Sequence, residues 1–438
     1  MSVRRQFIKY VSQNVLGMVG ISLYILADTF FISEAVGADG ITALNLVLPI
    51  YSIIFSIGAM LGVGSSIRYA VARNQGRPDA DMYFVNALFW GTLVSLVFVI
   101  LGVKAPDKVM MLFGADANIV RVGESYTRIF MVFAPCFVWN HIFNAFVRND
   151  EAPTVAMAAT LSSSLFNIVM DYVFMFPLGM GMAGAALATA VSPLIGVAVC
   201  CVHLLSKKSH VSWRWKKPSV RRLMFSCQVG ISALVGEISS GVITVMFNML
   251  ILDLAGNVGV AAYGVVANIA LVAIAVCNGI SQGMQPLISA CYAQGKHMEV
   301  KRLLWMGIWT VLTFSIVLVG CMYIWTTPIA NLFNRDHDVL LEAYAIRGLK
   351  LYFIGFLFAG INVVGTGVFS AMEEAKASFV ISLLRGFVFI CLSALLLAHL
   401  FGMTGVWLAF PVAEALALPV VFLIFKKTKV IGLQAEPE

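Results

Sequence analysis

The sequence predicts an all-α integral membrane protein that crosses the bilayer twelve times. Of its 438 residues, 60% are hydrophobic and only 12% are charged, and the mean hydropathy is +0.92. These proportions lie far outside those of a soluble domain. Apolar stretches of roughly 20 residues, enough to cross about 30 Å of hydrocarbon, recur between short polar segments, six in each half of the chain. The expected spans are 10–33, 41–67, 83–103, 122–147, 154–176, 182–205, 223–250, 259–290, 303–329, 344–371, 377–400 and 404–425.

The second half of the chain repeats the first at a distance of 219 residues, half its length. The segment Val-Gly-Ala-Asp-Gly-Ile-Thr-Ala at 36–43 reappears as Ala-Gly-Asn-Val-Gly-Val-Ala-Ala at 255–262, and the same shift relates Gly64 to Gly283 and Arg128 to Arg347. Self-similarity of this length indicates two copies of one fold. We therefore expect an N-terminal six-helix bundle at 1–205, a basic cytoplasmic linker at 206–222 and a C-terminal six-helix bundle at 223–438.

The basic residues predict the orientation in the membrane. With the N-terminus inside, twenty lysines and arginines fall in cytoplasmic segments and seven on the opposite side, as the positive-inside rule requires. An even number of spans then places both termini in the cytoplasm, and we expect a multi-pass protein of the cell membrane. The cluster from Lys207 to Arg222 accounts for much of the net charge of +7 without a nucleic-acid partner. Contact of this linker with anionic membrane lipid is a further option.

Motifs of soluble enzymes have little support in this chain. The segment Gly-Met-Gly-Met-Ala-Gly at 179–184 matches the dinucleotide fingerprint, but that motif requires a preceding strand and a soluble βαβ unit. Here it is a tight turn between two spans. The six histidines show no ligand spacing, and the eight cysteines lie within or beside apolar spans without a CxxC pair. We expect a monomeric protein without catalytic activity or cofactor.

Ionisable groups within the hydrocarbon mark candidate functional positions, because placing a charge there costs at least a few kcal/mol. Asp28 lies late in the first span, four residues after Tyr24 and on the same helix face. Asp171 lies late in the fifth span, four residues after Asn167. At a rise of 1.5 Å per residue, both acids lie roughly 30 Å from the inner surface. We therefore expect them to meet in the outer part of the N-terminal bundle.

Two neighbouring carboxyl groups in a medium of low dielectric constant cannot easily both be ionised. Together with Asn167, the two aspartates are expected to bind a proton or a small cation such as Na⁺. Asn140 and Asn144 on the fourth span and Thr189 on the sixth are expected to supply further oxygens or hydrogen bonds. The alternative is that Asp28 only caps a helix end or bonds to Asn167.

The C-terminal half carries a different set of polar residues. Glu237 lies near the middle of the seventh span, and Gln285 and Asn362 lie on polar faces of the eighth and tenth. These three form a candidate second site, with an interhelical hydrogen bond as the alternative role of Glu237. Arg385 and Glu414 lie at compatible depths on the last two spans, where a buried structural ion pair is favoured over a transport site.

Five short segments resemble sequences of one known family. They are Ala-Asp-Thr-Phe-Phe-Ile at 27–32, Val-Arg-Asn-Asp at 147–150, Asn-Ile-Val-Met-Asp at 167–171, Gly-Met-Gly-Met-Ala-Gly-Ala-Ala at 179–186 and Gln-Pro-Leu-Ile-Ser at 285–289. They look like the multidrug and toxic compound extrusion (MATE) transporters. The resemblance extends over both halves, and it is greatest to the bacterial multidrug exporters that carry an aspartate in the first span and Asn-x-x-x-Asp in the fifth.

The resemblance implies two six-helix bundles that form a V and are related by a pseudo-twofold axis along the membrane normal. It also implies export of amphipathic organic cations against an inward flow of H⁺ or Na⁺, with an N-terminal cation site at Asp28, Asn167 and Asp171. In the related Na⁺-coupled branch the seventh-span acid, here Glu237, pairs with an aspartate in the tenth span, where this chain has Asn362. The proline that bends the first span of some members is absent.

We therefore expect a secondary antiporter of organic cations or drugs that works by alternating access, because two parallel repeats can rock about a site between them. One carboxylate set would serve the coupling ion and the drug in turn. The first alternative is a lipid-linked oligosaccharide flippase of the same superfamily, which would favour a cationic cavity, whereas the intramembrane charges here are mainly acidic. The second is a membrane-embedded transferase, which would need His, Asp or Arg clustered at one membrane face.

Overall fold

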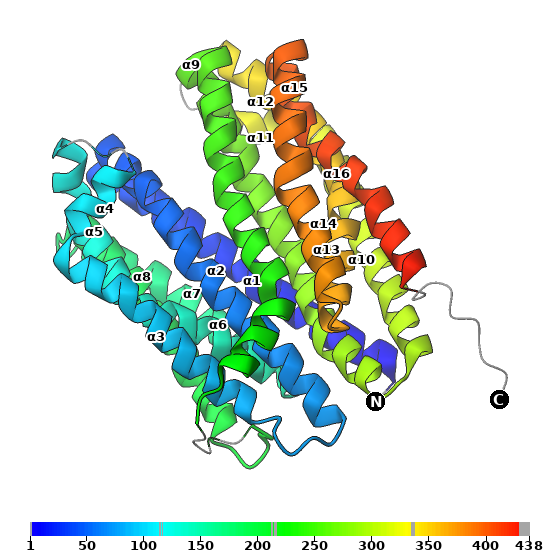
Figure 1. The fold of residues 1–438 in the computed structure, drawn as a ribbon. Coiled ribbons are helices and arrows are strands. Elements are labelled where there is room, and N and C mark those ends of the chain that lie inside the picture. Colours follow the sequence, from blue (N-terminus) through cyan, green and yellow to red (C-terminus); the bar gives the residue numbers. More distant parts are fainter. Residues whose placement is uncertain are drawn as a thin grey trace. The chain divides into compact units, whose positions relative to one another are not determined.

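The structure is a computed structural model that describes residues 2–113, 115, 117–211, 213, 217–333 and 338–428. Every regular element in these ranges is a helix, so the predicted all-α class is confirmed (Figure 1). Four residues that entered the charge count, Arg214, Lys216, Arg335 and Lys429, lie outside the described ranges.

The helices of the first repeat follow one another with short connections. They are α1 Val3–Val36, α2 Ala38–Asn74, α3 Met82–Lys104, α4 Pro106–Leu112, α5 Ala117–Val132, α6 Ala134–Asn149, α7 Pro153–Met175 and α8 Gly181–Leu204. The second repeat begins with a single long element. Its helices are α9 Val220–Ala293, α10 His297–Ile324, α11 Thr326–Phe333, α12 Val339–Tyr352, the 3₁₀ turn η1 Phe353–Gly355, α13 Phe356–Ala371, α14 Ala375–Leu383, the π-helical turn η2 Leu384–Val388, α15 Phe389–Phe401 and α16 Met403–Lys427.

The described residues contain the expected number of membrane crossings. Ten helical segments are long and apolar enough to cross a bilayer, and the bent pair α5 and α6 together makes another. One of the ten, α9, has 74 residues and contains two crossings, because its backbone breaks at Gly256 with φ 61° and ψ −158°. Glycine adopts such a conformation without steric cost. Gly256 lies in the repeated turn segment at 255–262, so the break occurs where the repeat predicts a turn.

Four spans that the sequence predicts as continuous are interrupted in the structure. The ninth breaks at Trp325 between α10 and α11, and the tenth contains the 3₁₀ turn η1. The fourth bends by 47° between α5 and α6, where Pro135 occupies the first turn of α6 and cannot donate a backbone hydrogen bond to the preceding helix. The eleventh contains the π-helical turn η2, which carries Arg385. Single π turns within α-helices are frequent at functional positions.

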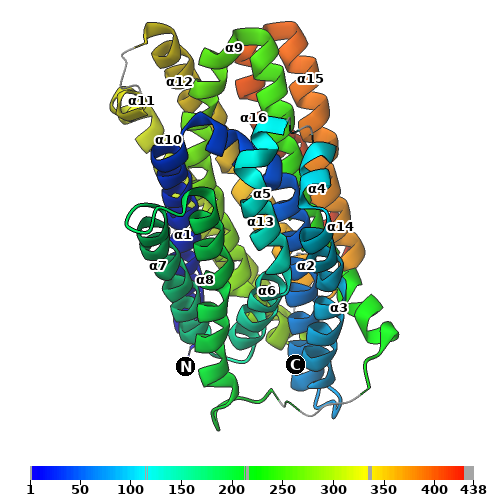
Figure 2. The same ribbon diagram turned by 90° about the vertical axis from the view of Figure 1, so that its left-hand side faces the viewer.

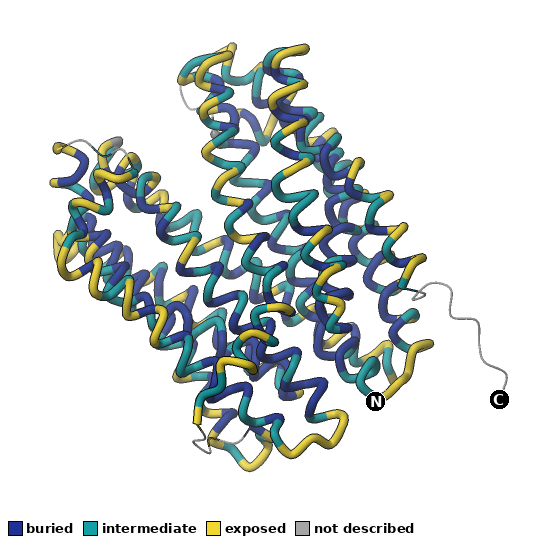
Figure 3. The backbone as a smooth tube through the Cα atoms, in the orientation of Figure 1, coloured by how far each residue is buried: buried dark blue, intermediate teal, exposed yellow. Residues whose placement is uncertain are grey.

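The chain divides into two compact units whose boundaries differ from the expected ones. The N-terminal unit comprises Leu16–Ile238, and the C-terminal unit comprises Met1–Val15 with Ser239–Glu438. The first residues of α1 therefore belong with the C-terminal repeat, and the first residues of α9 with the N-terminal repeat. Figure 3 shows buried, intermediate and exposed residues alternating along the helices, with exposed stretches at the connecting turns.

Close helix contacts at two glycines explain this exchange of helix ends. On α9, a Cβ added to Gly283 would lie 2.8 Å from Cα of Val11 on α1. On α2, a Cβ added to Gly64 would collide with the backbone carbonyl oxygen of Ser226 at the start of α9. Gly64 and Gly283 are equivalent under the 219-residue shift. The repeat thus keeps a glycine at each place where the start of one repeat's first helix packs closely, within one unit, on a helix of the other repeat.

The start of α1 and the end of α16 lie at the same end of their unit (Figures 1 and 2). This placement agrees with an even number of crossings.

A buried aspartate fixes the beginning of the linker to the N-terminal unit. Asp150, in the turn between α6 and α7, has no exposed side-chain surface. Its carboxylate oxygens bond to side chains of α2, to a histidine of α8 and to the chain that follows α8. The partners are Tyr69 Oη at 2.9 Å, Arg73 Nη1 at 3.3 Å, His203 Nε2 at 3.0 Å, Ser209 Oγ at 2.9 Å and the backbone N–H of His210 at 3.1 Å.

Candidate functional site

Asp28 and Asp171 come together inside the unit Leu16–Ile238. Asp28 on α1 is 8% exposed, and Asp171 on α7 is fully buried. Their carboxyl groups adjoin one another closely enough to share a hydrogen bond once one of them carries a proton. The structure therefore joins the two acids that helix rise places at similar depth.

Several oxygens of this acid pair lack a protein hydrogen-bond donor. Among the described residues, no donor meets either carboxyl oxygen of Asp171, and the same holds for one oxygen of Asp28 and for the amide oxygen of Asn167. Buried oxygens without a partner are unfavourable, so a proton or a cation is the natural means of satisfying them. Hard cations prefer such oxygen ligands. The residues present therefore fit either H⁺ or Na⁺ as a transported ion.

Asn167 and Thr189 orient the site from two neighbouring helices. Asn167 lies one turn before Asp171 on α7, so both side chains lie on the same helix face. Its amide nitrogen donates a hydrogen bond to Thr189 Oγ1 on α8 at 3.2 Å. Because the nitrogen is engaged, the amide oxygen is the atom that Asn167 can offer to a cation.

Three tyrosines adjoin the acid pair, two of which the sequence reasoning missed. Tyr24 Oη on α1 lies 3.1 Å from Tyr51 Oη on α2, and the Tyr51 ring stacks on Phe55 with centroids 4.0 Å apart. Tyr126 on α5 lies beside Thr189 and within electrostatic range of both aspartates. Neither Tyr51 nor Tyr126 belongs to a polar stripe, so only the packing of α2 and α5 against α1 and α8 reveals them.

Asn140 and Asn144, expected as further ligands, lie elsewhere. Asn144 on α6 donates hydrogen bonds to the Ala156 carbonyl oxygen at 3.1 Å and to Thr160 Oγ1 at 2.8 Å. Thr160 precedes Asp171 by eleven residues, about 16 Å along the helix. Asn140 approaches α8 at Gly196, seven residues beyond Thr189. The reason is topological: α6 and α7 are joined by a tight turn, so the end of α6 faces the start of α7.

In the C-terminal unit, Arg385 and Glu414 form a largely buried ion pair. Arg385 Nη2 lies 2.6 Å from Glu414 Oε1, and the two side chains are 18% and 5% exposed. Asn362 on α13 joins this pair, because its amide nitrogen donates to Glu414 Oε2 at 2.7 Å and to the Glu414 carbonyl oxygen at 2.9 Å.

The residues of the candidate second site, Glu237, Gln285 and Asn362, are divided between the two units, and that site stays a prediction. Asn362 is engaged by Glu414, whereas Gln285 is buried with no partner for its amide oxygen among the described residues. Glu237 belongs to the unit Leu16–Ile238, where it lies within electrostatic range of Tyr24. The sequence reasoning divided the chain at the linker and did not anticipate that the start of α9 packs with the first repeat.

Comparison with known proteins identifies the family. The MatE family model matches residues 15–173 and 233–395, which together make up more than half of the chain. The chain belongs to the MatE family. One matched segment lies in each repeat, at corresponding positions, and the first contains Asp28 and Asp171. The expectation of a MATE-family membrane transporter, rather than an enzyme, is confirmed.

Known relatives are similar to this protein over nearly its whole length. The multidrug export protein MepA of Staphylococcus aureus strain MSSA476 is 26% identical over 412 residues, which cover 92% of this chain and 89% of the relative. MepA of Staphylococcus saprophyticus is 23% identical over 407 residues, with the same two coverages. An outward-facing multidrug resistance MATE family transporter has a TM-score of 0.91 at 22% identity, over 99% of this chain and 97% of that one. MATE in a bent conformation has a TM-score of 0.87 at 22% identity, covering 99% and 96%. These structural matches establish the fold.

Proposed function

We propose that this protein is a secondary exporter of amphipathic organic cations, driven by an inward flow of H⁺ or Na⁺. The observation that carries the proposal is the buried pair of Asp28 and Asp171, in which three of the four carboxyl oxygens meet no donor among the described residues. A pair of this kind needs a positive charge, which a proton, a sodium ion or an organic cation can supply. The named multidrug export relatives support drugs as the cargo.

Exchange follows from shared use of the acid pair. When the coupling ion occupies Asp28 and Asp171, the pair is neutralised and holds an organic cation less tightly. When the ion has left, the uncompensated charge favours cation binding. Occupancy by one therefore lowers the affinity for the other by the same factor, since coupling between two ligands is reciprocal. In this scheme Asn167 and Thr189 orient the ion's ligands and do not change their own charge.

The aromatic residues beside the acid pair suit the apolar part of the cargo. Tyr51 stacks on Phe130 with ring centroids 5.0 Å apart, and Phe130 packs on Phe137 at 4.6 Å. Aromatic faces attract organic cations through the ring quadrupole. A flat, cationic compound is therefore the cargo class that we assign to this site. For the direction of transport, the charge count supports an orientation with both termini in the cytoplasm.

The proposal is tested by transport of a fluorescent organic cation into everted membrane vesicles. We expect Asp28→Asn to abolish uptake driven by the ion gradient, because the pair can no longer exchange its charge. Asn144→Ala is the matched control, since Asn144 is also a polar residue of an N-terminal helix but bonds to Thr160. Transport by Asp28→Asn at the wild-type rate would refute the site.

The coupling ion is identified in proteoliposomes that carry a Na⁺ gradient alone or a pH gradient alone. The proposal expects uptake under one of the two gradients, and Asp171→Asn is expected to remove that response. Uptake that needs neither gradient would contradict ion-driven exchange.

A further inference from the structure

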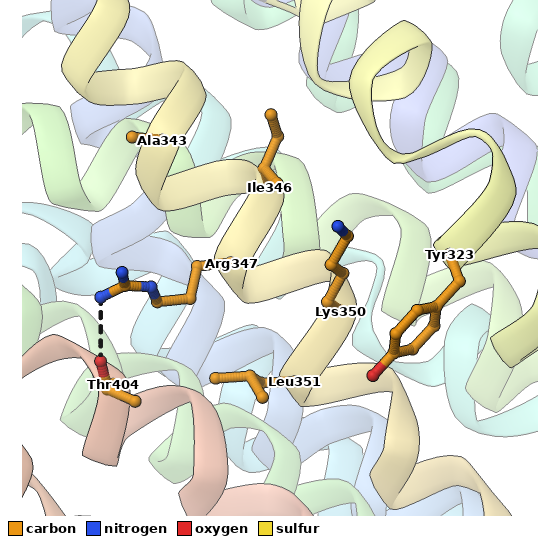
Figure 4. A pocket seen from close by; sticks show the side chains of 7 residues that line it. All are labelled: Tyr323, Ala343, Ile346, Arg347, Lys350, Leu351 and Thr404. Atoms are coloured by element: carbon orange, nitrogen blue, oxygen red, sulfur yellow. Dashed lines mark hydrogen bonds between the residues drawn. The ribbon is translucent and has the colours of Figure 1, made fainter.

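A basic recess of about 430 Å³ lies in the C-terminal unit, whereas the acid pair belongs to the other unit. Arg347 and Lys350 line it from α12, with Tyr323 from α10 and Thr404 from α16. Figure 4 shows Arg347 directed towards Thr404 and Lys350 on the side of Tyr323. Arg347 Nη1 donates a hydrogen bond to Thr404 Oγ1 at 3.2 Å. Among the described residues, neither Arg347 nor Lys350 forms an ion pair with an acid.

The equivalent place in the first repeat is neutralised. Arg128, the counterpart of Arg347 under the 219-residue shift, pairs with Glu124 one turn earlier at 2.5 Å. The residue equivalent to Glu124 in the second repeat is Ala343, which lines the recess. The loss of this acid leaves the guanidinium of the second repeat without its partner.

A second replacement adds charge to the same recess. Lys350 is the counterpart of Met131, which is 1% exposed and packs in the core of the first repeat. An acid has thus become alanine and a buried methionine has become lysine, one turn either side of the shared arginine. These two changes raise the net charge of the lining of the recess by two, whereas Glu342, the counterpart of Gly123, does not line it. General packing of a helical bundle does not require this change, since the first repeat packs without it.

The surroundings of the recess suit the boundary between lipid headgroups and acyl chains. Tyr323 is 48% exposed, and the next residues along the chain, Ile324 and Trp325, are 72% and 53% exposed. Phe401, three residues before Thr404, is 59% exposed. Exposed tyrosine and tryptophan at the end of a membrane helix are typical of the interface. A ligand in the recess would therefore have charged and hydroxyl groups at its head and apolar surface beside it.

We propose that this recess binds the phosphate group of an anionic phospholipid on the side of the membrane where α12 begins. A guanidinium can hold two phosphate oxygens at once, and an ammonium group acts as a second point charge. Thr404 and Tyr323 supply hydroxyl groups for the remaining oxygens, and the exposed side chains near them contact the acyl chains. The site has the opposite charge to the acid pair, and the proposal of a lipid site does not depend on the proposed export of organic cations. Free phosphate offers the same head chemistry without the apolar part.

The test is native mass spectrometry of the full-length protein in detergent, titrated with phosphatidylglycerol or with phosphatidylcholine. We expect phosphatidylglycerol to bind more tightly than phosphatidylcholine. Each basic residue near the membrane surface contributes about fivefold to anionic-lipid affinity, so Arg347→Ala with Lys350→Ala should weaken phosphatidylglycerol binding about 25-fold. Arg128→Ala is the matched control, because it removes the equivalent but paired arginine, and should leave this binding unchanged.

A second variant keeps both basic residues and the fold. Ala343→Glu restores the acid that the first repeat has at this position, and should weaken phosphatidylglycerol binding about fivefold by pairing with Arg347. Unchanged binding in both Ala343→Glu and the double variant would overturn the proposal. Displacement of the lipid by inorganic phosphate at equal concentration would overturn the assignment to a lipid, and equal binding of the two phospholipids would overturn the role of charge.

Discussion

Replacement of Asp150 should destabilise the N-terminal unit more than the loss of an exposed ion pair does. In Asp150→Ala, Arg73 and His203 lose a common buried partner, and Tyr69 Oη, Ser209 Oγ and the His210 N–H lose their acceptor. Breaking a buried charged pair by removing one member typically costs about 3–5 kcal/mol. We expect this range for the free energy of unfolding. Asp150→Asn retains one acceptor oxygen, so we expect a smaller loss of about 1–3 kcal/mol.

The assay is equilibrium unfolding of the purified protein by sodium dodecyl sulfate in mixed micelles. Glu124→Ala is the control, because it breaks the Arg128–Glu124 pair, whose side chains are 54% and 37% exposed. Exposed pairs of this kind contribute about 0–1 kcal/mol. If Asp150→Ala loses no more stability than Glu124→Ala, the reasoning that a buried aspartate anchors the linker is refuted. The free energy of unfolding should decrease in the order wild type, Glu124→Ala, Asp150→Asn and Asp150→Ala.

Three further outcomes follow from the packing. Glu414→Ala should lower the free energy of unfolding by about 3–5 kcal/mol, because Arg385 stays buried without its acid. Glu414→Leu combined with Arg385→Met should lower the free energy of unfolding far less. Equal losses of stability in the two variants would contradict a structural role for the pair. Gly283→Ala should cost about 1–3 kcal/mol, since its Cβ would meet the backbone of α1, and a thermal melt matching wild type would disprove that close contact. Asn144→Ala should lower the melting temperature and leave the affinity for organic cations unchanged in a direct binding assay; weaker binding would return Asn144 to the site.

Hydropathy and the repeat predict most of the fold because each membrane span must satisfy its own backbone hydrogen bonds. Helix length and rise then place Asp28 and Asp171 at similar depth, and the structure brings their carboxyl groups together. The same reasoning fails for Asn144, because helix depth says nothing about which neighbouring helix a side chain faces. In the structure, the tight turn after α6 directs Asn144 to the start of α7.

Long-range packing accounts for the other differences between sequence and structure. Asp150 joins residues up to 81 positions away from it in the chain, and no spacing rule connects Tyr69, His203 and Ser209 before the bundle has formed. The start of each repeat's first helix packs with the other repeat because of close contacts at glycines. The repeat shows which glycines recur, but it does not show which helices they contact. The differences between the two copies of the repeat were nevertheless informative. Where the two copies differ, as at Glu124 and Ala343, the difference marks a change of chemistry.

The central claim is that the coupling ion and the organic cation compete for the acid pair. The direct measurement is equilibrium binding of a fluorescent organic cation to the purified protein over a range of pH at constant Na⁺, and over a range of Na⁺ at constant pH. For the wild type, the affinity should fall as the coupling ion increases, and for Asp171→Asn it should be independent of both ions. An Asp171→Asn variant that keeps the wild-type dependence on pH or Na⁺ would contradict the account.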